Sequence, residues 1–162
     1  MSKQTYLWHI VPLRLWIGYY MLQQGITKYK RDFPHGDWIG RQIGDVNTVE
    51  TFEWYKNFLI NTVATHKELF GQLVMWGEIA VGVCVLLGLF TRYASIGGIF
   101  LMVNYFCAIG YPKGGASQAQ QITFAVSFLV FILSSPGRVL GLDAILFRGG
   151  APRPPKRPER RP

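Results

Sequence analysis

Charge is scarce in this sequence of 162 residues: only 16% are Asp, Glu, Lys or Arg, against roughly a quarter in soluble globular domains. The charges that exist leave long gaps. None occurs in the 20 residues between Arg92 and Lys113 or in the 24 between Lys113 and Arg138, and Glu78 is the only one within 69–91. Since a helix needs about 20 apolar residues to cross a bilayer, these gaps exclude a soluble enzyme domain and indicate an integral membrane protein.

Cysteine and histidine are also rare. Cys84 and Cys107 stand alone in separate apolar stretches, so redox exchange by a Cys-x-x-Cys pair is excluded. His9, His35 and His66 lie far apart and form no ligand cluster with the acids, which argues against haem held by two histidines and against zinc or iron. We therefore expect no metal site and no covalently bound cofactor.

The apolar stretches predict an all-α fold, an integral membrane four-helix bundle within residues 1–148. The spans are expected at about 8–28, 69–90, 93–111 and 117–134. The first carries Arg14 and is followed by no small-residue cleavage site, so we expect it to be retained rather than removed as a signal peptide.

Two shorter helical segments are expected outside the spans. Asn47, followed by Glu50, is typical of a helix N-terminus and predicts an amphipathic helix over about 48–65, either capping the bundle at the outer membrane surface or forming a lid over a substrate. After the fourth span, apolar residues mixed with Arg138, Asp143 and Arg148 predict an amphipathic segment on the inner surface.

The basic residues predict the topology. The N-terminus, the turn at Arg92 and the chain after the fourth span carry 10 of the 17 Lys and Arg residues with only two acids, so both termini are expected in the cytoplasm of a multi-pass inner-membrane protein. Residues 149–162 form a basic Pro/Arg-rich tail, which suits anionic lipid headgroups or a partner subunit better than nucleic acid. Its candidate partner-binding residues are Arg153, Lys156, Arg157, Arg160 and Arg161.

An acid near the centre of a span is costly and needs a partner or a role. Arg14 is the partner expected for Glu78; it shares a narrow helical stripe with Gly18, Gly25 and Lys28, of which Lys28 is expected at the solvated outer interface. Such a pair would fix the register of two helices. Alternatively, Glu78 helps to line a pocket for a small polar headgroup such as a quinone ring, or passes protons. The candidate pocket residues for a quinone or lipid are Tyr20, Gln24, Trp76 and Asn104.

Several short motifs together resemble the DoxX family over about residues 13–146. They are Arg14-Leu15 with Gly18, Gly25 and Lys28; Gly77-Glu78-Ile79 with Gly82 and the run Leu86-Leu87-Gly88-Leu89-Phe90-Thr91-Arg92; and Pro136-Gly137-Arg138 with Leu142-Asp143. The resemblance implies a small four-helix membrane protein. It also implies a redox setting, because relatives include a subunit of thiosulfate:quinone oxidoreductase and membrane partners of other redox assemblies.

Two functions follow as hypotheses. The first is a non-catalytic accessory subunit of a larger membrane electron-transfer complex, which stabilises larger membrane subunits and lines a quinone or lipid site. The second is a catalytic membrane subunit of a thiosulfate:quinone-type oxidoreductase, in which Glu78 accepts a proton and Arg14 holds its charge.

Overall fold

The computed structural model describes residues 7–37, 51–138 and 140–146, and every regular element within them is helical. A 3-10 turn, Leu7–Ile10, leads into α1 (Val11–Lys30), and after α3 (Glu53–Phe58) and the π-helical turn η2 (Leu59–Val63) the chain enters α4 (Lys67–Leu87). Then come α5 (Thr91–Tyr105), the π-helical turn η3 (Phe106–Gly110), the single turn α6 (Tyr111–Lys113), α7 (Gly115–Ser134), the 3-10 turn η4 (Pro136–Arg138) and α8 (Leu142–Leu146). The all-α prediction is confirmed.

Three of these helical segments are long and apolar enough to cross a membrane: Lys67–Leu87, Thr91–Ile109 and Gly115–Ser134. Helix α1 has comparable length, but Arg14, Lys28 and two glutamines make it more polar. Arg14 is buried and Lys28 is partly buried, whereas Gln23 is exposed on the same side as Leu15, Trp16 and Ile26.

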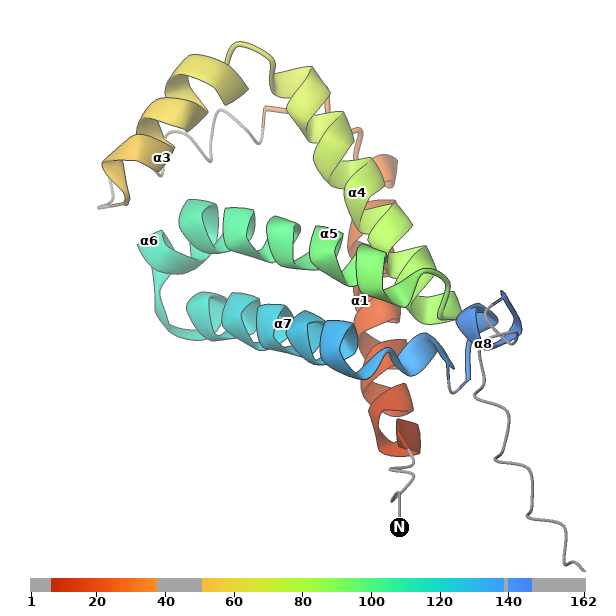
Figure 1. The fold of residues 1–162 in the computed structure, drawn as a ribbon. Helices are drawn as coiled ribbons and strands as arrows, with labels where there is room; N and C mark the ends of the chain where they lie inside the picture. Colours follow the sequence, from red (N-terminus) through yellow and green to blue (C-terminus); the bar gives the residue numbers. More distant parts are fainter. Residues whose placement is uncertain (1–6, 38–50, 139, 147–162) are drawn as a thin grey trace, which may run out of the picture.

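The helices pack as two pairs. Helix α1 lies along α4, and α5 lies along α7. Figure 1 shows that the α5–α7 pair crosses the α1–α4 pair steeply, instead of continuing it as a parallel four-helix bundle. The short turn between α4 and α5 contributes to this change of direction, because Gly88 and Phe90 both adopt left-handed backbone conformations, with φ of 66° and 47°.

One apolar core joins all four long helices. Ile17 and Met21 of α1, Val81 and Val85 of α4, Leu101 and Met102 of α5, and Phe128 and Phe131 of α7 are buried together. A second, smaller cluster fixes α3 and η2 on η3 through Tyr55, Leu59, Val63 and Cys107. The segment predicted as a helix over 48–65 is helical from Glu53, and the side that carries Tyr55, Leu59 and Val63 is buried. The predicted cap at Asn47 and Glu50 lies outside the described residues, as does the tail after residue 146.

Candidate functional site

Glu78 pairs with Lys28 inside the helices. The Lys28 ammonium donates to both carboxylate oxygens, with Nζ 2.5 Å from Oε1 and from Oε2. The side chain of Glu78 is only 2% exposed and that of Lys28 only 18%. Because a lone buried carboxylate is costly, this ammonium is what makes the position of Glu78 tolerable.

Tyr105 of α5 completes the cluster. Its hydroxyl donates to Glu78 Oε1 at 2.5 Å and accepts from Lys28 Nζ at 3.0 Å. The ammonium also lies 5.1 Å from the centroid of the Tyr105 ring and 5.3 Å from that of Phe33, distances at which aromatic faces attract cations. The three residues, from α1, α4 and α5, thus share one hydrogen-bonded network, which we call the Lys28–Glu78–Tyr105 cluster.

Close backbone packing brings these residues together. A methyl group added to Gly18 would lie 2.6 Å from the Leu86 nitrogen, and one added to Gly25 would lie 2.9 Å from that of Ile79. The sequence predicted that these glycines share a stripe with Arg14, and all three are buried. Since residue 18 meets 86 and residue 25 meets 79, α1 and α4 are antiparallel and in contact over most of their lengths.

The predicted pair of Arg14 and Glu78 is wrong, and the register explains why. Arg14 lies beside Gly88, which follows Glu78 by ten residues and so by about 15 Å along α4. Lys28, expected at a solvated interface, lies instead at the level of Glu78. The guanidinium of Arg14 instead forms hydrogen bonds with backbone carbonyl groups: it donates to Pro136 O at 2.9 Å and to Leu140 O.

Asp143 is the acid near Arg14, and it is buried rather than exposed on a surface helix as its sequence context predicted. Its carboxylate accepts from the backbone N–H groups of Phe90 and Thr91 and from the Thr91 hydroxyl. An acid in this place satisfies free donors at the start of α5 and complements the helix dipole. The motif residues around Gly88, Pro136 and Asp143 therefore form one junction, which joins the α4–α5 turn to the chain after α7.

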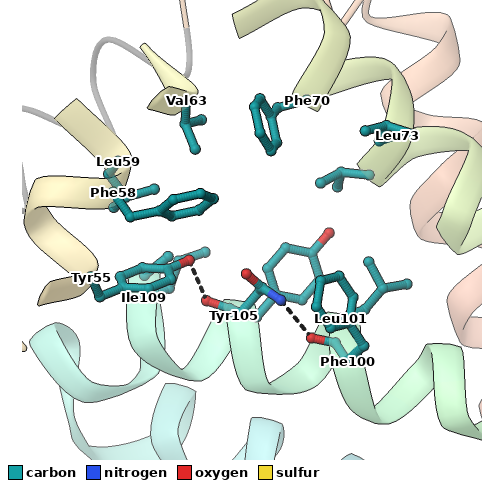
Figure 2. Close-up of a pocket in the computed structure, with 13 residues that line it drawn as sticks. Tyr55, Phe58, Leu59, Val63, Phe70, Leu73, Phe100, Leu101, Tyr105 and Ile109 are labelled. Atoms are coloured by element: carbon teal, nitrogen blue, oxygen red, sulfur yellow. Dashed lines mark hydrogen bonds between the residues drawn. The ribbon is translucent and has the colours of Figure 1, made fainter. Parts of the chain in front are cut away.

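An apolar cavity of about 250 Å³ lies on the other side of Tyr105. Figure 2 shows side chains from α3, α4 and α5 pointing into it. It is lined by Tyr55, Phe58, Leu59, Val63, Phe70, Leu73, Val74, Phe100, Leu101, Asn104, Tyr105, Ala108 and Ile109. Tyr105 therefore belongs both to the wall of the cavity and to the Lys28–Glu78–Tyr105 cluster.

The pocket candidates chosen from sequence do not gather around Glu78. Asn104 lines the cavity, and its amide donates to Phe100 O at 2.8 Å. Trp76 points outward, 55% exposed, with its ring near that of Tyr29. Tyr20 packs edge-on against Phe124 and accepts from Gln120 of α7. Gln24 is half-buried on α1. The tail candidates after residue 152 lie outside the described residues.

Sequence reasoning missed three roles: Lys28 as the partner of Glu78, Tyr105 as the third member of the cluster, and Asp143 as the buried acceptor at the α4–α5 turn. Lys28 carried a usable signal, because it shares the stripe of Gly18 and Gly25, and an antiparallel neighbour would bring it to the level of Glu78. Tyr105 gave no such signal. Among the residues that the structure describes, no group of three or more His, Cys, Asp and Glu side chains is placed to hold a metal ion. Both cysteines are free thiols.

Comparison with known proteins gives one family. The model of the family DoxX matches residues 9–110, a stretch that contains the whole Lys28–Glu78–Tyr105 cluster. The motif at Pro136 and Asp143 follows that stretch. No solved structure matches the chain. Together with three helices suited to crossing a bilayer, the match makes this a membrane protein, and the chain belongs to the DoxX family.

Proposed function

We propose that the protein is an integral-membrane accessory subunit of a larger membrane electron-transfer complex, in which it stabilises larger subunits and lines a lipid or quinone site. One observation carries the proposal: the buried charges join helices. The Lys28–Glu78–Tyr105 cluster ties α1 to α4 and α5, while Arg14 and Asp143 tie α1 and the α4–α5 turn to the segment after α7. Groups used in this way favour a scaffold over a reaction centre.

In this proposal α1 is a fourth span. Its contacts with α4 run antiparallel from Gly18 against Leu86 to Gly25 against Ile79. A helix that packs so closely along a membrane-spanning neighbour would cross the bilayer together with it. The charges within α1 are no obstacle, because Arg14 is buried and Lys28 is paired with Glu78.

The proposed orientation follows from charge. The N-terminus, the turn at Arg92 and the tail face the cytoplasm of the inner membrane, where the excess of basic residues belongs. The helix α3 and the turn η2 then lie at the outer surface as the amphipathic element between the first two spans. Trp54 and Phe58 are exposed there, which suits the interfacial region of a bilayer.

The proposed partner surfaces are the basic tail and the outward side of α7. This helix exposes Ile122, Val126, Leu129 and Leu133 in one band, a surface suited to lipid or to a neighbouring transmembrane subunit. The tail residues Arg153, Lys156, Arg157, Arg160 and Arg161 would add charge at the cytoplasmic surface.

Purification of the tagged full chain in a mild detergent tests the accessory role. Native electrophoresis and mass spectrometry should find it together with much larger subunits. Replacing the five basic residues of the tail with Gln should weaken this association, whereas replacing the exposed Lys30, Arg31 and Lys67 with Gln should not. Recovery of a stable isolated protein that carries out electron transfer fully without larger subunits would refute the proposal.

The alternative is a catalytic membrane subunit of a thiosulfate:quinone-type oxidoreductase. It is favoured by the position of Tyr105, which bridges the Glu78 carboxylate and the cavity. Electrons lost by the sulfur substrate would reduce a quinone to its quinol. The quinol also needs two protons; Glu78 would serve as proton acceptor, taking them up from water one at a time and passing them to the quinone oxygens, with Lys28 rather than Arg14 holding its charge. Glu78→Gln should abolish quinone reduction while the complex still assembles; unchanged turnover would remove this alternative.

A further inference from the structure

The cavity behind Tyr105 has walls that suit a hydrocarbon chain. Both hydroxyl donors in its wall are bonded to other groups, since Tyr55 donates to Asn104 O at 3.1 Å and Tyr105 donates to Glu78; one N–H of the Asn104 amide donates to Phe100 O. Figure 2 shows the first and the last of these bonds at the edge of the cavity. A quinone ring needs donors for its carbonyl oxygens, whereas a hydrocarbon chain needs none.

The size of the cavity also points to an apolar occupant. Apolar cavities of about 150 Å³ stay dry and bind benzene-sized molecules, because water inside them has too few polar partners. This cavity measures about 250 Å³. It therefore has room for a larger apolar group than benzene.

The cavity opens sideways, toward the surroundings of α4 and α5. Leu73 of α4 and Phe100 of α5 line it and are 58% and 68% exposed, whereas Leu59 and Val63 at its back are buried. Both α4 and α5 belong to segments that are long and apolar enough to cross a membrane, and the proposed function places them there. The mouth consequently faces the hydrocarbon region of the bilayer, where acyl chains are the abundant molecules.

An unusual backbone surrounds the cavity. The π-helical turns η2 and η3 both line it, η2 through Leu59 and Val63 and η3 through Ala108 and Ile109. Such turns are rare and occur frequently at functional sites. Two of them facing one cavity indicate that its shape serves a ligand.

We infer that this cavity holds an acyl chain of a membrane lipid, inserted from the bilayer between Leu73 and Phe100, with the headgroup outside. The inference narrows the ligand part of the proposed function and rests on its placement of α4 and α5 in the membrane. Through Tyr105, the bound chain would exclude water from the side of the Lys28–Glu78–Tyr105 cluster that faces the cavity.

The test is photolabelling of the full chain in vesicles of phosphatidylethanolamine and phosphatidylglycerol, with a trace of phosphatidylglycerol that carries a diazirine in its acyl chain. After illumination and digestion, mass spectrometry should find label on Leu59 and Val63, which are buried from the outer surface, as well as on the exposed Leu129 and Leu133 of α7. Label confined to the exposed residues would overturn the inference.

Paired variants sharpen the result. Val74→Trp fills the cavity and should abolish labelling of Leu59 and Val63 while leaving that of Leu129 and Leu133, whereas Val126→Trp, on the exposed side of α7, should leave labelling of Leu59 and Val63 unchanged. If Val74→Trp does not fold, the wild-type pattern still decides. Displacement of the label from Leu59 and Val63 by added long-tailed quinone, but not by excess unlabelled phosphatidylglycerol, would show a quinone tail instead and refute the inference. Association with larger subunits is measured separately, so failure of the accessory role leaves this result intact.

Discussion

Asp143 accepts two hydrogen bonds from Thr91, one from the backbone N–H at 3.0 Å and one from the hydroxyl at 2.9 Å. A third comes from the Phe90 N–H at 2.7 Å. The Asp143 N–H in turn donates to Gly88 O at 2.9 Å. A residue of the short helix α8 thereby fixes the turn between α4 and α5, and with it the direction in which the α5–α7 pair leaves the α1–α4 pair.

Asp143→Ala should destabilise the protein strongly. The change leaves the Thr91 and Phe90 donors without their acceptor and removes a negative charge that interacts with Arg14, so we expect a loss of about 3–5 kcal/mol in the free energy of unfolding. Thermal or SDS-induced unfolding in micelles, followed by circular dichroism, measures it. Asp37→Ala, at an exposed acid, is the control and should change little. An equal, small effect of both variants would contradict the role of Asp143.

Lys28 and Glu78 should show energetic coupling. Lys28→Met leaves a buried carboxylate unpaired and should cost about 3–5 kcal/mol. Adding Glu78→Gln removes that charge yet keeps an acceptor for Tyr105, so the double variant should be less destabilised than the sum of the single variants, by about 1–3 kcal/mol. Unfolding in detergent gives all the values. Lys30→Met, at an exposed lysine of the same helix, is the matched control; strict additivity would refute the coupling.

The burial of Tyr55 predicts that the stability of the protein depends on pH. Burial, and secondarily the charge of Cys107, raises the pKa of Tyr55 from 10.0 to about 12. The folded state then holds this proton where the unfolded state has lost it, so the stability that Tyr55 contributes is complete below pH 10 and is lost as the pH rises from 10 to about 12. Between pH 10 and about 12, the free energy of unfolding should fall less steeply with pH for Tyr55→Phe than for the wild-type protein. Tyr93→Phe, at an exposed tyrosine, should retain the wild-type slope, and identical slopes for all three proteins would contradict the assignment.

The sequence predicted correctly those features that depend on a single helix. The stripe of Arg14, Gly18 and Gly25 on α1 follows from helical periodicity, and all three residues are buried. The apolar lengths of α4, α5 and α7 were equally clear because charge is absent from them. These features need no knowledge of which element packs on which.

Partners across helices could not be predicted in this way. Whether Glu78 meets Arg14 or Lys28 depends on the axial register of α1 against α4, which close contacts at Gly18 and Gly82 set. Asp143 was assigned to a surface segment because its neighbours alternate as in an amphipathic helix; its burial depends on the path of the chain after α7. The cavity arises only when α3 and the adjoining turn η2 come together with α4, α5 and η3, which follow later in the sequence.

The glycine contacts between α1 and α4 give the last prediction. A methyl group at Gly18 would lie 2.6 Å from the Leu86 nitrogen and 2.8 Å from its Cα, both backbone atoms that cannot move without shifting the helix. Gly82 meets the backbone of Leu22 in the same way. Gly18→Ala or Gly82→Ala should therefore cost about 3 kcal/mol or more, because overpacking outweighs the better helix propensity of alanine.

Gly77→Ala is the matched control on α4. There the added methyl group would meet only Leu101 methyl groups, at 3.8 Å, an ordinary packing distance. Alanine should stabilise the helix at this position by up to about 1 kcal/mol. Unfolding in micelles measures all three variants. Moreover, Gly18→Ala and Gly82→Ala separate the helices that carry Lys28 and Glu78, so they should also reduce the coupling between those two residues, whereas Gly77→Ala should preserve it. If all three substitutions behaved alike, the close α1–α4 contact would not set the register of the buried pair.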